Sequence, residues 1–349
     1  VERTAKASRL SESEVARKAI QLAHEGAATV KAGSRGDNGG DRASHVGYYL
    51  IDKGLPQLER AAEARLSSAE AVRRTACRFP LILYLGAIAL LTLAFAGNLL
   101  DKAYAGGLHG WMLALIAILL VLCTSHLASA LVNWAATLLA APRPLPRLDF
   151  STRIPPECRT LVVVPTMLTS AQNLEDLVEA LEVRFLANRD DHLHFGLLTD
   201  FRDAREETLP EDEALLLLAR NRIEELNEKY RTAASGADSD AFFLFHRPRR
   251  WNPQDGLWMG YERKRGKLAE LNSLLRGGVR DSFSLIVGTT DVLSSVKYVI
   301  TLDTDTQLPR DSARQFVGAM AHPLNRAQFD EARQLVTEGY GILQPRVAV

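Results

Sequence analysis

Residues 160–165 read TLVVVP, a continuous apolar and β-branched run that decides the fold of the C-terminal half. A run of this kind is typical of a strand buried on both faces, as in a parallel sheet covered by helices on each side. From this strand outward, strand and helix patterns alternate, which predicts an α/β domain with a mainly parallel sheet. The expected strands are 160–165, 192–200, 241–245 and 296–302, and the expected helices are 173–187, 209–230 and 263–275.

Two long apolar segments precede this domain. Residues 79–100 and 111–140 carry no charge, and each is long enough at helical rise to cross a bilayer core of about 30 Å. Arginines flank the outer ends of both segments, whereas the connecting loop has a single lysine. We therefore expect a transmembrane hairpin in a bacterial-type inner membrane with both ends in the cytoplasm. The alternative is a pair of helices buried in the core of a soluble domain.

The segments before and directly after the two apolar helices are expected to be helical packing segments and linkers. Ser11 and Glu14 have the spacing of a capping box and predict a helix over residues 11–30. Residues 31–43 are rich in glycine and charge, which is typical of a flexible linker. The expected division is an N-terminal cytoplasmic helical segment at 1–78, two spans within 79–141, a proline-rich stiff linker at 142–158 and a cytoplasmic domain at 159–349.

Composition excludes several classes of protein. Lysine plus arginine and aspartate plus glutamate both total 42, so no net positive charge is present to hold nucleic-acid phosphates without sequence preference. The three cysteines include no Cys-x-x-Cys pair, which argues against a disulfide framework and a cysteine zinc site. We expect the lipid bilayer, and not nucleic acid, to be a partner of this chain.

Four candidate ligand residues follow the expected strands. Thr166 comes after the first strand, Asp200 ends the second, and Asp303 and Asp305 end the fourth. Ligands of such sheets gather at the carboxyl ends of the strands. Two carboxylates separated by one residue offer oxygen ligands to a hard cation and leave room for a diphosphate. We expect Asp303 and Asp305 to bind Mg²⁺ or Mn²⁺; the alternative is an acidic pair in an ordinary surface turn.

Three other sequence features bear on alternative ligand sites: a P-loop, a dinucleotide-binding loop and a basic contact surface. Residues 260–268, GYERKRGKL, have five residues between the glycines where a P-loop has four, and Leu268 stands where a hydroxyl should bind magnesium. No G-x-G-x-x-G opens the first helix of the domain, so a dinucleotide cradle is also missing. The basic run at 247–251, with Trp251, suits either contacts to phosphate or sugar, or an exposed turn. We interpret it as lying outside the immediate site.

Isolated polar residues are expected to be structural. His192 and His194 alternate along a strand with no further ligand nearby, which favours a structural role over a metal site. His126 and Asn133 lie seven residues apart in the second apolar segment, on nearly the same helix face. They either line a passage or bond to the neighbouring helix, and we favour the second interpretation.

Four motifs occur in a familiar order: TLVVVPT, LLTD, GKLAELN and ITLDTDTQLP. Together they resemble the inverting, membrane-embedded family 2-like glycosyltransferases, which include cellulose and hyaluronan synthases. The longer stretches HVGYYLID, DGLWMGYERKRGKLAELN and ITLDTDTQLPRDSARQ are more closely similar to the cyclic β-1,2-glucan synthases, in their glycosyltransferase family 84 region. The resemblance covers residues 44 to 349 and implies a GT-A-like domain, here incomplete.

The resemblance also implies roles for individual residues. It implies that the donor nucleotide is held by Thr166, Asp200, Lys267, Asn272 and Asp303, and the metal by Asp303 and Asp305. In the Lys-x-x-x-Leu-Asn pattern, Lys267 would contact the donor diphosphate. The implied reaction transfers glucose from UDP-glucose to a glucan acceptor, while the metal and Lys267 stabilise the charge on departing UDP.

The resemblance leaves part of the reaction outside this sequence. In the related synthases the base that activates the acceptor lies in a later motif, so we expect the catalytic base beyond Val349 and the chain to be a piece of a longer protein. Two other functions stay open. One is a different processive synthase that uses another UDP-sugar, and the other is a non-enzymatic membrane module that binds a nucleotide or a protein partner.

Overall fold

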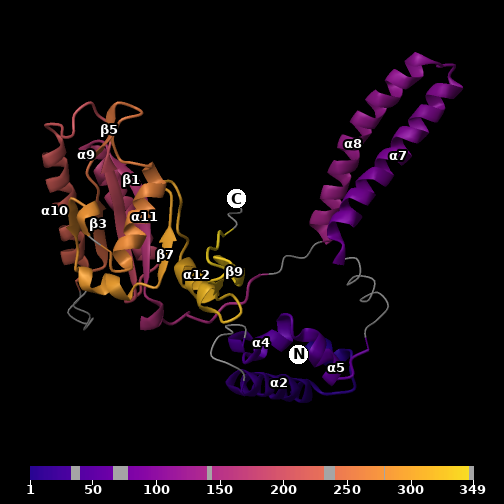
Figure 1. Cartoon of the computed structure of the whole chain (residues 1–349), viewed down its shortest axis with the longest axis horizontal. Helices are drawn as coiled ribbons and strands as arrows, with labels where there is room; N and C mark the ends of the chain where they lie inside the picture. The colour runs from indigo at the N-terminus through magenta and orange to yellow at the C-terminus, as the bar shows by residue number, and fades with distance from the viewer. Residues whose placement is uncertain (33–39, 66–77, 140–143, 232–239, 279, 346–349) are drawn as a thin grey trace. The chain divides into compact units, whose positions relative to one another are not determined.

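The computed structural model describes residues 1–32, 40–65, 78–139, 144–231, 240–278 and 280–345 (Figure 1). The chain divides into two units, Val1–Leu145 and Pro146–Val349. Most of the predicted helices and strands lie in these ranges. The centre of the predicted glycine-rich linker and residues 66–77 of the predicted N-terminal helical segment lie outside them.

The second unit is built on a five-stranded sheet in the order β6-β3-β2-β1-β7. Four strands are parallel, and β6 pairs antiparallel with β3 at one edge. The predicted α/β class with a mostly parallel sheet is therefore confirmed. The strands are β1 (Thr160–Leu168), β2 (Leu193–Phe201), β3 (Phe242–His246), β6 (Leu285–Val287) and β7 (Tyr298–Thr301).

Helices cover both faces of this sheet, which explains the uninterrupted apolar run in β1 (Figure 1). Val162 and Val164 face the cluster that contains side chains of α9 (Ala171–Ala187), α10 (Asp212–Tyr230) and α12 (Ser312–Ala321). Leu161 and Val163 face the other cluster, with α11 (Arg263–Leu275). All four β1 side chains are completely buried. The bounds of α11 agree with the predicted helix, whereas α12 was not predicted.

Two antiparallel hairpins and a short strand were also missed from the sequence. The first hairpin joins β4 (Arg250–Asn252) to β5 (Leu257–Met259), between β3 and α11. The second joins β8 (Gln328–Asp330) to β9 (Leu335–Glu338). Each of these strands has only three or four residues, and β6 has three, so none produces a long apolar run.

The proline-rich segment is packed onto the second unit. The Leu148 N–H donates to the Gly318 carbonyl at 3.0 Å, and the Asn325 side chain donates to the Pro146 carbonyl at 2.7 Å. Residues 144–155 are non-helical, as predicted, and one 3-10 turn, Pro156–Cys158, leads into β1. These contacts hold the entry to β1 in place.

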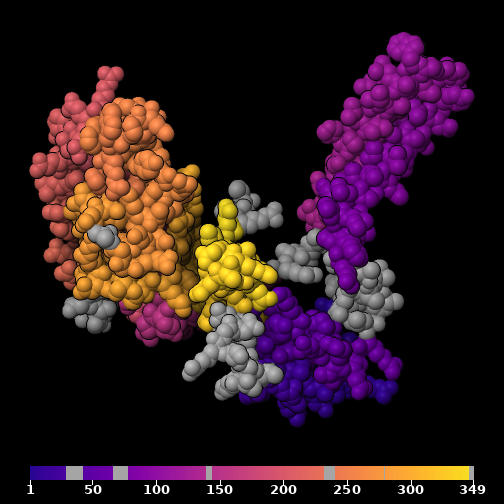
Figure 2. All heavy atoms as spheres, in the orientation of Figure 1, coloured from indigo at the N-terminus to yellow at the C-terminus, as the bar shows by residue number. Residues whose placement is uncertain are grey.

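The two long apolar helices form a hairpin, as expected. They are α7 (Pro80–Ala105) and α8 (Trp111–Leu139), and both are long and apolar enough to cross a membrane. Leu93 and Trp111 are 70% and 75% exposed, and Figure 2 draws the two helices as an elongated purple body. Within the described residues, α7 and α8 are therefore not buried core helices of a soluble domain. Helix α7 continues five residues past the predicted end.

A hydrogen bond between the two apolar helices accounts for one predicted polar residue. Tyr84 donates its hydroxyl hydrogen to Asn133 Oδ1 at 2.8 Å. This agrees with the interpretation that Asn133 bonds to the neighbouring helix. Thr124 in α8 also donates to the Leu120 carbonyl of its own helix at 2.7 Å, which satisfies its hydroxyl without water.

Short helices pack against one long helix at the N-terminus. The apolar contacts join α2 to the segments that follow it through Val15, Ala19, Tyr49 and Leu58. The predicted capping box is present, because the Ser11 N–H donates to the Glu14 carboxylate at 2.8 Å and the Glu14 N–H donates back to Ser11 Oγ at 3.3 Å. The helices are α1 (Glu2–Lys6), α2 (Glu12–Ala32), α3 (Gly40–Ala43), α4 (Val46–Ile51) and α5 (Leu55–Ala61). The predicted linker at 31–43 is thus helical at both ends.

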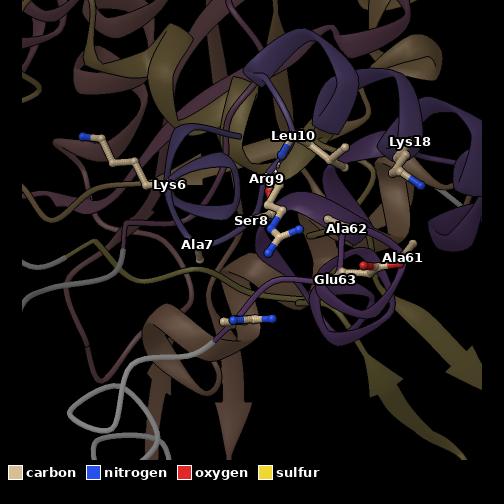
Figure 3. Close-up of a pocket in the computed structure, with 10 residues that line it drawn as sticks. Lys6, Ala7, Ser8, Arg9, Leu10, Lys18, Ala61, Ala62 and Glu63 are labelled. Atoms are coloured by element: carbon tan, nitrogen blue, oxygen red, sulfur yellow. Dashed lines mark hydrogen bonds between the residues drawn. The ribbon is translucent and has the colours of Figure 1, made fainter.

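A pocket of about 340 Å³ opens among these N-terminal helices (Figure 3). Its lining includes Lys6, Arg9, Lys18 and Glu63. Lys6 is already paired with Glu2 at 2.6 Å, so one of these positive charges is balanced within α1. This pocket belongs to the first unit and is distinct from the strand ends of the second unit.

Candidate functional site

The order of the strands identifies the place where a ligand would bind. From β1 the chain moves in one direction, to β2 and then β3, whereas β7 lies on the opposite side of β1. In open α/β sheets, ligands bind at the carboxyl ends of the two strands on either side of such a reversal, here β1 and β7. Asp303 follows β7, and Thr166 lies near the end of β1. The predicted residues therefore lie at the switch point of the sheet.

Thr166, Asp200 and Lys267 meet at these strand ends. In the β1–β2 register Thr166 lies opposite Thr199, one residue before the pair Met167 and Asp200. Lys267 of α11 donates from Nζ to Asp200 Oδ1 at 2.7 Å and also to the Thr166 carbonyl. The Asp200 and Lys267 side chains are 1% and 5% exposed. Three of the five sequence-predicted donor residues, from three different elements, thus meet at one place: Asp200 and Lys267 are buried, and Thr166 contributes its backbone carbonyl.

Burial acts on the charge of Lys267. Removal from water lowers the pKa of Lys267 below its ordinary value, and the attraction of Asp200 opposes this decrease. Buried charges persist where each has a hydrogen-bonded partner, which Lys267 and Asp200 provide for each other. Replacement of either partner alone would leave the other as an uncompensated buried charge.

Arg247 completes the cluster, and it was placed outside the immediate site by the sequence interpretation. Its side chain is 3% exposed and donates to Asp200 Oδ2 at 3.2 Å and to Glu270 Oε2 at 3.1 Å. It also donates to the Tyr261 carbonyl at 3.1 Å. The alternative of an exposed basic turn is therefore wrong for Arg247. Burial against Asp200, 47 residues earlier in the chain, could not be read from local sequence.

Arg249 is buried as well, for a structural reason. Its guanidinium donates to the Arg202 carbonyl at 2.7 Å and forms two hydrogen bonds with the Asp212 carboxylate. The exposed-turn interpretation is wrong for this residue too. Arg250, which is half exposed, pairs with Glu270 Oε1 at 3.2 Å. Asp200 and Glu270 are thus two carboxylates that pair with three cations, Arg247, Arg250 and Lys267. One positive charge is left in excess, which favours binding of an anion.

The glycines of GYERKRGKL allow this cluster to close. A Cβ atom on Gly260 would lie 2.0 Å from Asp200 Oδ2, and one on Gly266 would lie 2.3 Å from the Tyr261 carbonyl and 3.0 Å from Arg247 Nη1. Both approaches are shorter than a side chain permits. The spacing of Gly260 and Gly266 does not match a P-loop. Close packing around Asp200 and Arg247 explains why glycine occupies both positions.

The acidic pair lies exposed beyond β7. The Asp303 side chain is 61% exposed and pairs with Lys264 in the first turn of α11. Asp305 is exposed, and among the described residues its carboxylate has no recorded hydrogen bond or ion pair. Of the two predicted metal ligands, Asp303 thus forms an ion pair with Lys264, and Asp305 is exposed to solvent.

Arg184 fixes the backbone of this acidic loop. It comes from α9, is 3% exposed, and donates to the Thr304 carbonyl at 2.7 Å and to the Thr306 carbonyl at 3.0 Å. Burial lowers the pKa of Arg184 relative to its ordinary value. Arg184 was not predicted as a site residue, because only the fold brings α9 next to a loop about 120 residues later in the chain.

The residues at the loop fit a metal that is shared with a ligand. Within the described ranges, no group of three or more His, Cys, Asp or Glu side chains is arranged to hold a metal ion. Two neighbouring carboxylates, Asp303 and Asp305, suffice for Mg²⁺ or Mn²⁺ when phosphate oxygens and water complete the coordination. The donor set therefore suits a cation bound together with a diphosphate and not a closed protein site.

The other singled-out residues lie away from this cluster. Asn272 is exposed on α11 and, five residues after Lys267, is on a different face of that helix. His194 Nδ1 lies 3.0 Å from the Asp240 carbonyl oxygen, and burial lowers the pKa of His194 to about 4. His246, which the sequence analysis did not single out, lies 2.8 Å from Thr199 Oγ1. The structure thus favours the predicted structural role for His194.

Comparison with known proteins extends the similarity over the whole chain. No protein-family model matches it. A curated protein, the cyclic beta-(1,2)-glucan synthase NdvB of Rhizobium meliloti, is 36% identical over 349 residues. The chain is similar to a cyclic β-(1,2)-glucan synthase. The alignment covers 99% of this chain, and the chain spans 12% of the length of that glucan synthase. The resemblance to cyclic β-1,2-glucan synthases, predicted from the longer stretches of sequence, is therefore confirmed.

Proposed function

We propose that this chain carries the donor-binding part of an inverting, membrane-bound glucosyltransferase that transfers glucose from UDP-glucose to a growing β-1,2-glucan. The similarity to a cyclic β-(1,2)-glucan synthase supports a glucan synthase role. The observation that carries the donor assignment is the convergence of Thr166, Asp200 and Lys267 at the carboxyl ends of β1 and β2. This is where nucleotides bind in open α/β sheets.

Each group has a distinct role in the proposal. Asp303 and Asp305 hold Mg²⁺ or Mn²⁺ with the donor diphosphate; the bound cation supplies Lewis-acid stabilisation of the charge on departing UDP. Lys267 and Arg247 add positive charge next to the strand ends, inside a buried environment where electrostatic attraction is stronger than in water. Thr166 and Asp200 position the nucleoside. A donor contact of Asn272 rests on the resemblance alone, because Asn272 is exposed on a different face of α11 from Lys267.

We also propose that α7 and α8 cross the bacterial inner membrane. Their length, mean hydropathy of 2.1 and 2.4, and exposed apolar side chains support this arrangement. Arg78 precedes α7 and Arg147 follows α8, which favours the cytoplasmic side for both ends of the hairpin and for the sheet domain.

The proposed donor site is tested by calorimetric binding of UDP to the detergent-solubilised chain, with Mn²⁺ or with a chelator. The native chain is expected to bind UDP only with Mn²⁺. The double variant Asp303→Asn/Asp305→Asn should lose this binding and keep its thermal stability, because both carboxylates are exposed. Asp281→Asn, which changes another exposed aspartate of the same unit, is the matched control and should bind UDP as the native chain does.

Two results would count against this proposal. A folded sample that binds no UDP, or binds it without metal and without the two aspartates, would favour a non-enzymatic binding module. Competition by UDP-glucose against other UDP-sugars separates a glucosyltransferase from a synthase for another sugar. A clear preference for a different sugar would overturn the glucose assignment and leave the donor site intact.

A further inference from the structure

Two tryptophans face the same way on the small hairpin between β3 and α11. Trp251 in β4 lies directly opposite Trp258 in β5, and the ring centroids are 5.9 Å apart with an interplanar angle of 59°. Trp251 is 50% exposed, and Trp258 is partly exposed. Neither ring belongs to any of the three apolar core clusters of the described chain. Their presence is therefore not explained by packing of the domain.

The hairpin is held rigidly. Gly256 adopts φ +64° in its turn, and the Gly256 N–H donates to the Asn252 carbonyl at 2.9 Å. The Asn252 side chain donates to Asp255 at 2.7 Å. Trp258 exchanges backbone hydrogen bonds with Ala204 at 2.8 and 2.9 Å, which ties the hairpin to the segment that follows β2. The tryptophan pair is therefore preorganised, and a ligand would lose little affinity to ordering of this part.

The hairpin is also continuous with the donor cluster. Its first residue, Arg250, shares the Glu270 carboxylate with Arg247, which in turn contacts Asp200. After β5 the chain passes through Gly260, which packs on Asp200, and enters α11. Because side chains alternate along a strand, the tryptophans lie on the face opposite Arg250. The hairpin thus adjoins the donor cluster through Arg250, and the aromatic pair lies on the other face of the same hairpin.

Indole rings of this kind suit a sugar chain. The face of an aromatic ring carries partial negative charge, and the C–H groups on the flat face of a β-linked glucose residue carry partial positive charge. The turn between the strands is closed by its own polar groups, because Asn252 donates to Asp255 at 2.7 Å and the Gln254 N–H donates to Asn252 Oδ1 at 3.0 Å. Half-exposed aromatic side chains on such a fixed turn suit a ligand contact.

We propose that Trp251 and Trp258 form a stacking subsite for the glucan acceptor, next to the donor cluster. This inference rests on the proposed glucosyltransferase function, because it takes the occupant to be the glucan product chain. A protein segment that covers the same rings is the competing occupant, and the experiment separates the two. A Trp251 variant that keeps UDP binding would exclude the nucleoside of the donor as the occupant.

The experiment uses the four tryptophans of the chain. Trp111→Phe/Trp134→Phe removes the two exposed tryptophans of the apolar hairpin, so emission excited selectively from tryptophan comes from Trp251 and Trp258 alone. A linear β-1,2-linked glucose trisaccharide is titrated into this variant in detergent, with an α-1,4-linked trisaccharide as control. We expect the β-1,2 trisaccharide to change the intensity or wavelength of the emission saturably and the α-1,4 trisaccharide to leave it unchanged.

Calorimetry on tryptophan variants then locates the sugar. Trp251→Ala should weaken trisaccharide binding about tenfold, and Trp251→Phe, which keeps a smaller ring, should weaken it less. Both variants should bind UDP with Mn²⁺ as the native chain does. Trisaccharide binding that is unchanged in Trp251→Ala/Trp258→Ala overturns the inference, as does equal binding of the α-1,4 control.

UDP binding separates failure of this inference from failure of the proposed function. A native chain that binds UDP with Mn²⁺ but no trisaccharide overturns the acceptor subsite alone. A folded chain that binds neither overturns both. Loss of UDP binding in Trp251→Phe would assign the rings to the donor site and would also overturn the inference.

Discussion

The Arg184 guanidinium donates to the Thr304 carbonyl at 2.7 Å, so a buried side chain of α9 holds the loop between the two exposed carboxylates Asp303 and Asp305. Thr304 is the residue that separates them in sequence. A metal site made of two neighbouring side chains depends on the backbone that spaces them. Arg184 is therefore a positioning residue for the proposed cation.

Arg184→Met is expected to weaken Mn²⁺-dependent UDP binding about tenfold and to lower the free energy of unfolding by ~2 kcal/mol, because several charge-assisted hydrogen bonds to carbonyls are lost. Calorimetry and thermal unfolding measure the two effects. Arg222→Met removes an arginine of similar length from a surface pair with Glu175 and should leave UDP binding unchanged. Equal UDP affinity in both variants would contradict the positioning role.

Lys264→Met is expected to strengthen binding of Mn²⁺ alone by up to about fivefold. The Lys264 ammonium pairs with Asp303, so a cation at this carboxylate must first displace it; half-exposed pairs of this kind are worth ~0–1 kcal/mol. The measurement is a Mn²⁺ titration without nucleotide. Arg265→Met removes the next cation of α11, which pairs with Glu262 and not with Asp303. Unchanged Mn²⁺ affinity in Lys264→Met would show that the ammonium does not compete.

Gly260→Ala is expected to abolish UDP binding and to destabilise the chain by ~1–3 kcal/mol. The new methyl group would lie 2.0 Å from Asp200 Oδ2 and would push the carboxylate away from Lys267. Gly86→Ala is the matched control, because no atom lies within 4 Å of a Cβ placed there. UDP binding by Gly260→Ala at native affinity would count against a role for the Asp200–Lys267 pair.

Stability is expected to fall on acidification below about pH 6.5, the ordinary value for histidine. Burial lowers the pKa of His194 to about 4 and the pKa of His246 to about 3, so in this range the unfolded chain binds more protons than the folded chain. The contribution of each histidine to the free energy of unfolding is fully present above the unfolded-state pKa. It declines by ~1.4 kcal/mol per pH unit as the pH falls toward the folded-state pKa.

Unfolding titrations at pH 4.5 and pH 7.5 measure this slope. His194→Phe should reduce the change in the free energy of unfolding between the two pH values by the contribution of one histidine, because the imidazole that gains a proton on unfolding is removed. His24→Gln changes an exposed histidine of α2 and should keep the full slope. A pH dependence that is the same in native chain and His194→Phe would contradict burial of a neutral imidazole.

Periodicity and apolar runs predicted the architecture well. The apolar run at 160–165 predicted strand β1, and the length of the two uncharged segments predicted the helices of the apolar hairpin. Both signals are local properties of the sequence. Strand ends also predicted that Thr166 and Asp200 lie together, since parallel strands align their carboxyl ends. Short elements such as β4 and β5 were missed, although Asp255-Gly256 is a turn signal.

The remaining features of the candidate site depend on contacts between distant segments. Arg247 looked like part of a basic surface run, and only its contact with Asp200 distinguishes it from Arg250, which is half exposed. Arg184 lies on a helix whose sequence is ordinary, and its function depends on a loop that arrives from the far side of β1. No local pattern encodes such a pairing, because hydrogen-bond geometry of this kind is decided by the fold.

The pairing of β1 with β7 has a consequence for synthesis. Val163 and Thr301 are partners in the sheet although they lie about 140 residues apart, whereas β1, β2 and β3 pair with strands that follow closely. Closure of so long a loop carries a high entropic cost and follows the formation of nearer contacts. As the nascent chain leaves the ribosome, β1, β2 and β3 can assemble first, and the acidic loop joins them only after β7 has emerged. Premature termination before β7 would therefore leave a sheet that folds in part and has no place for a cation.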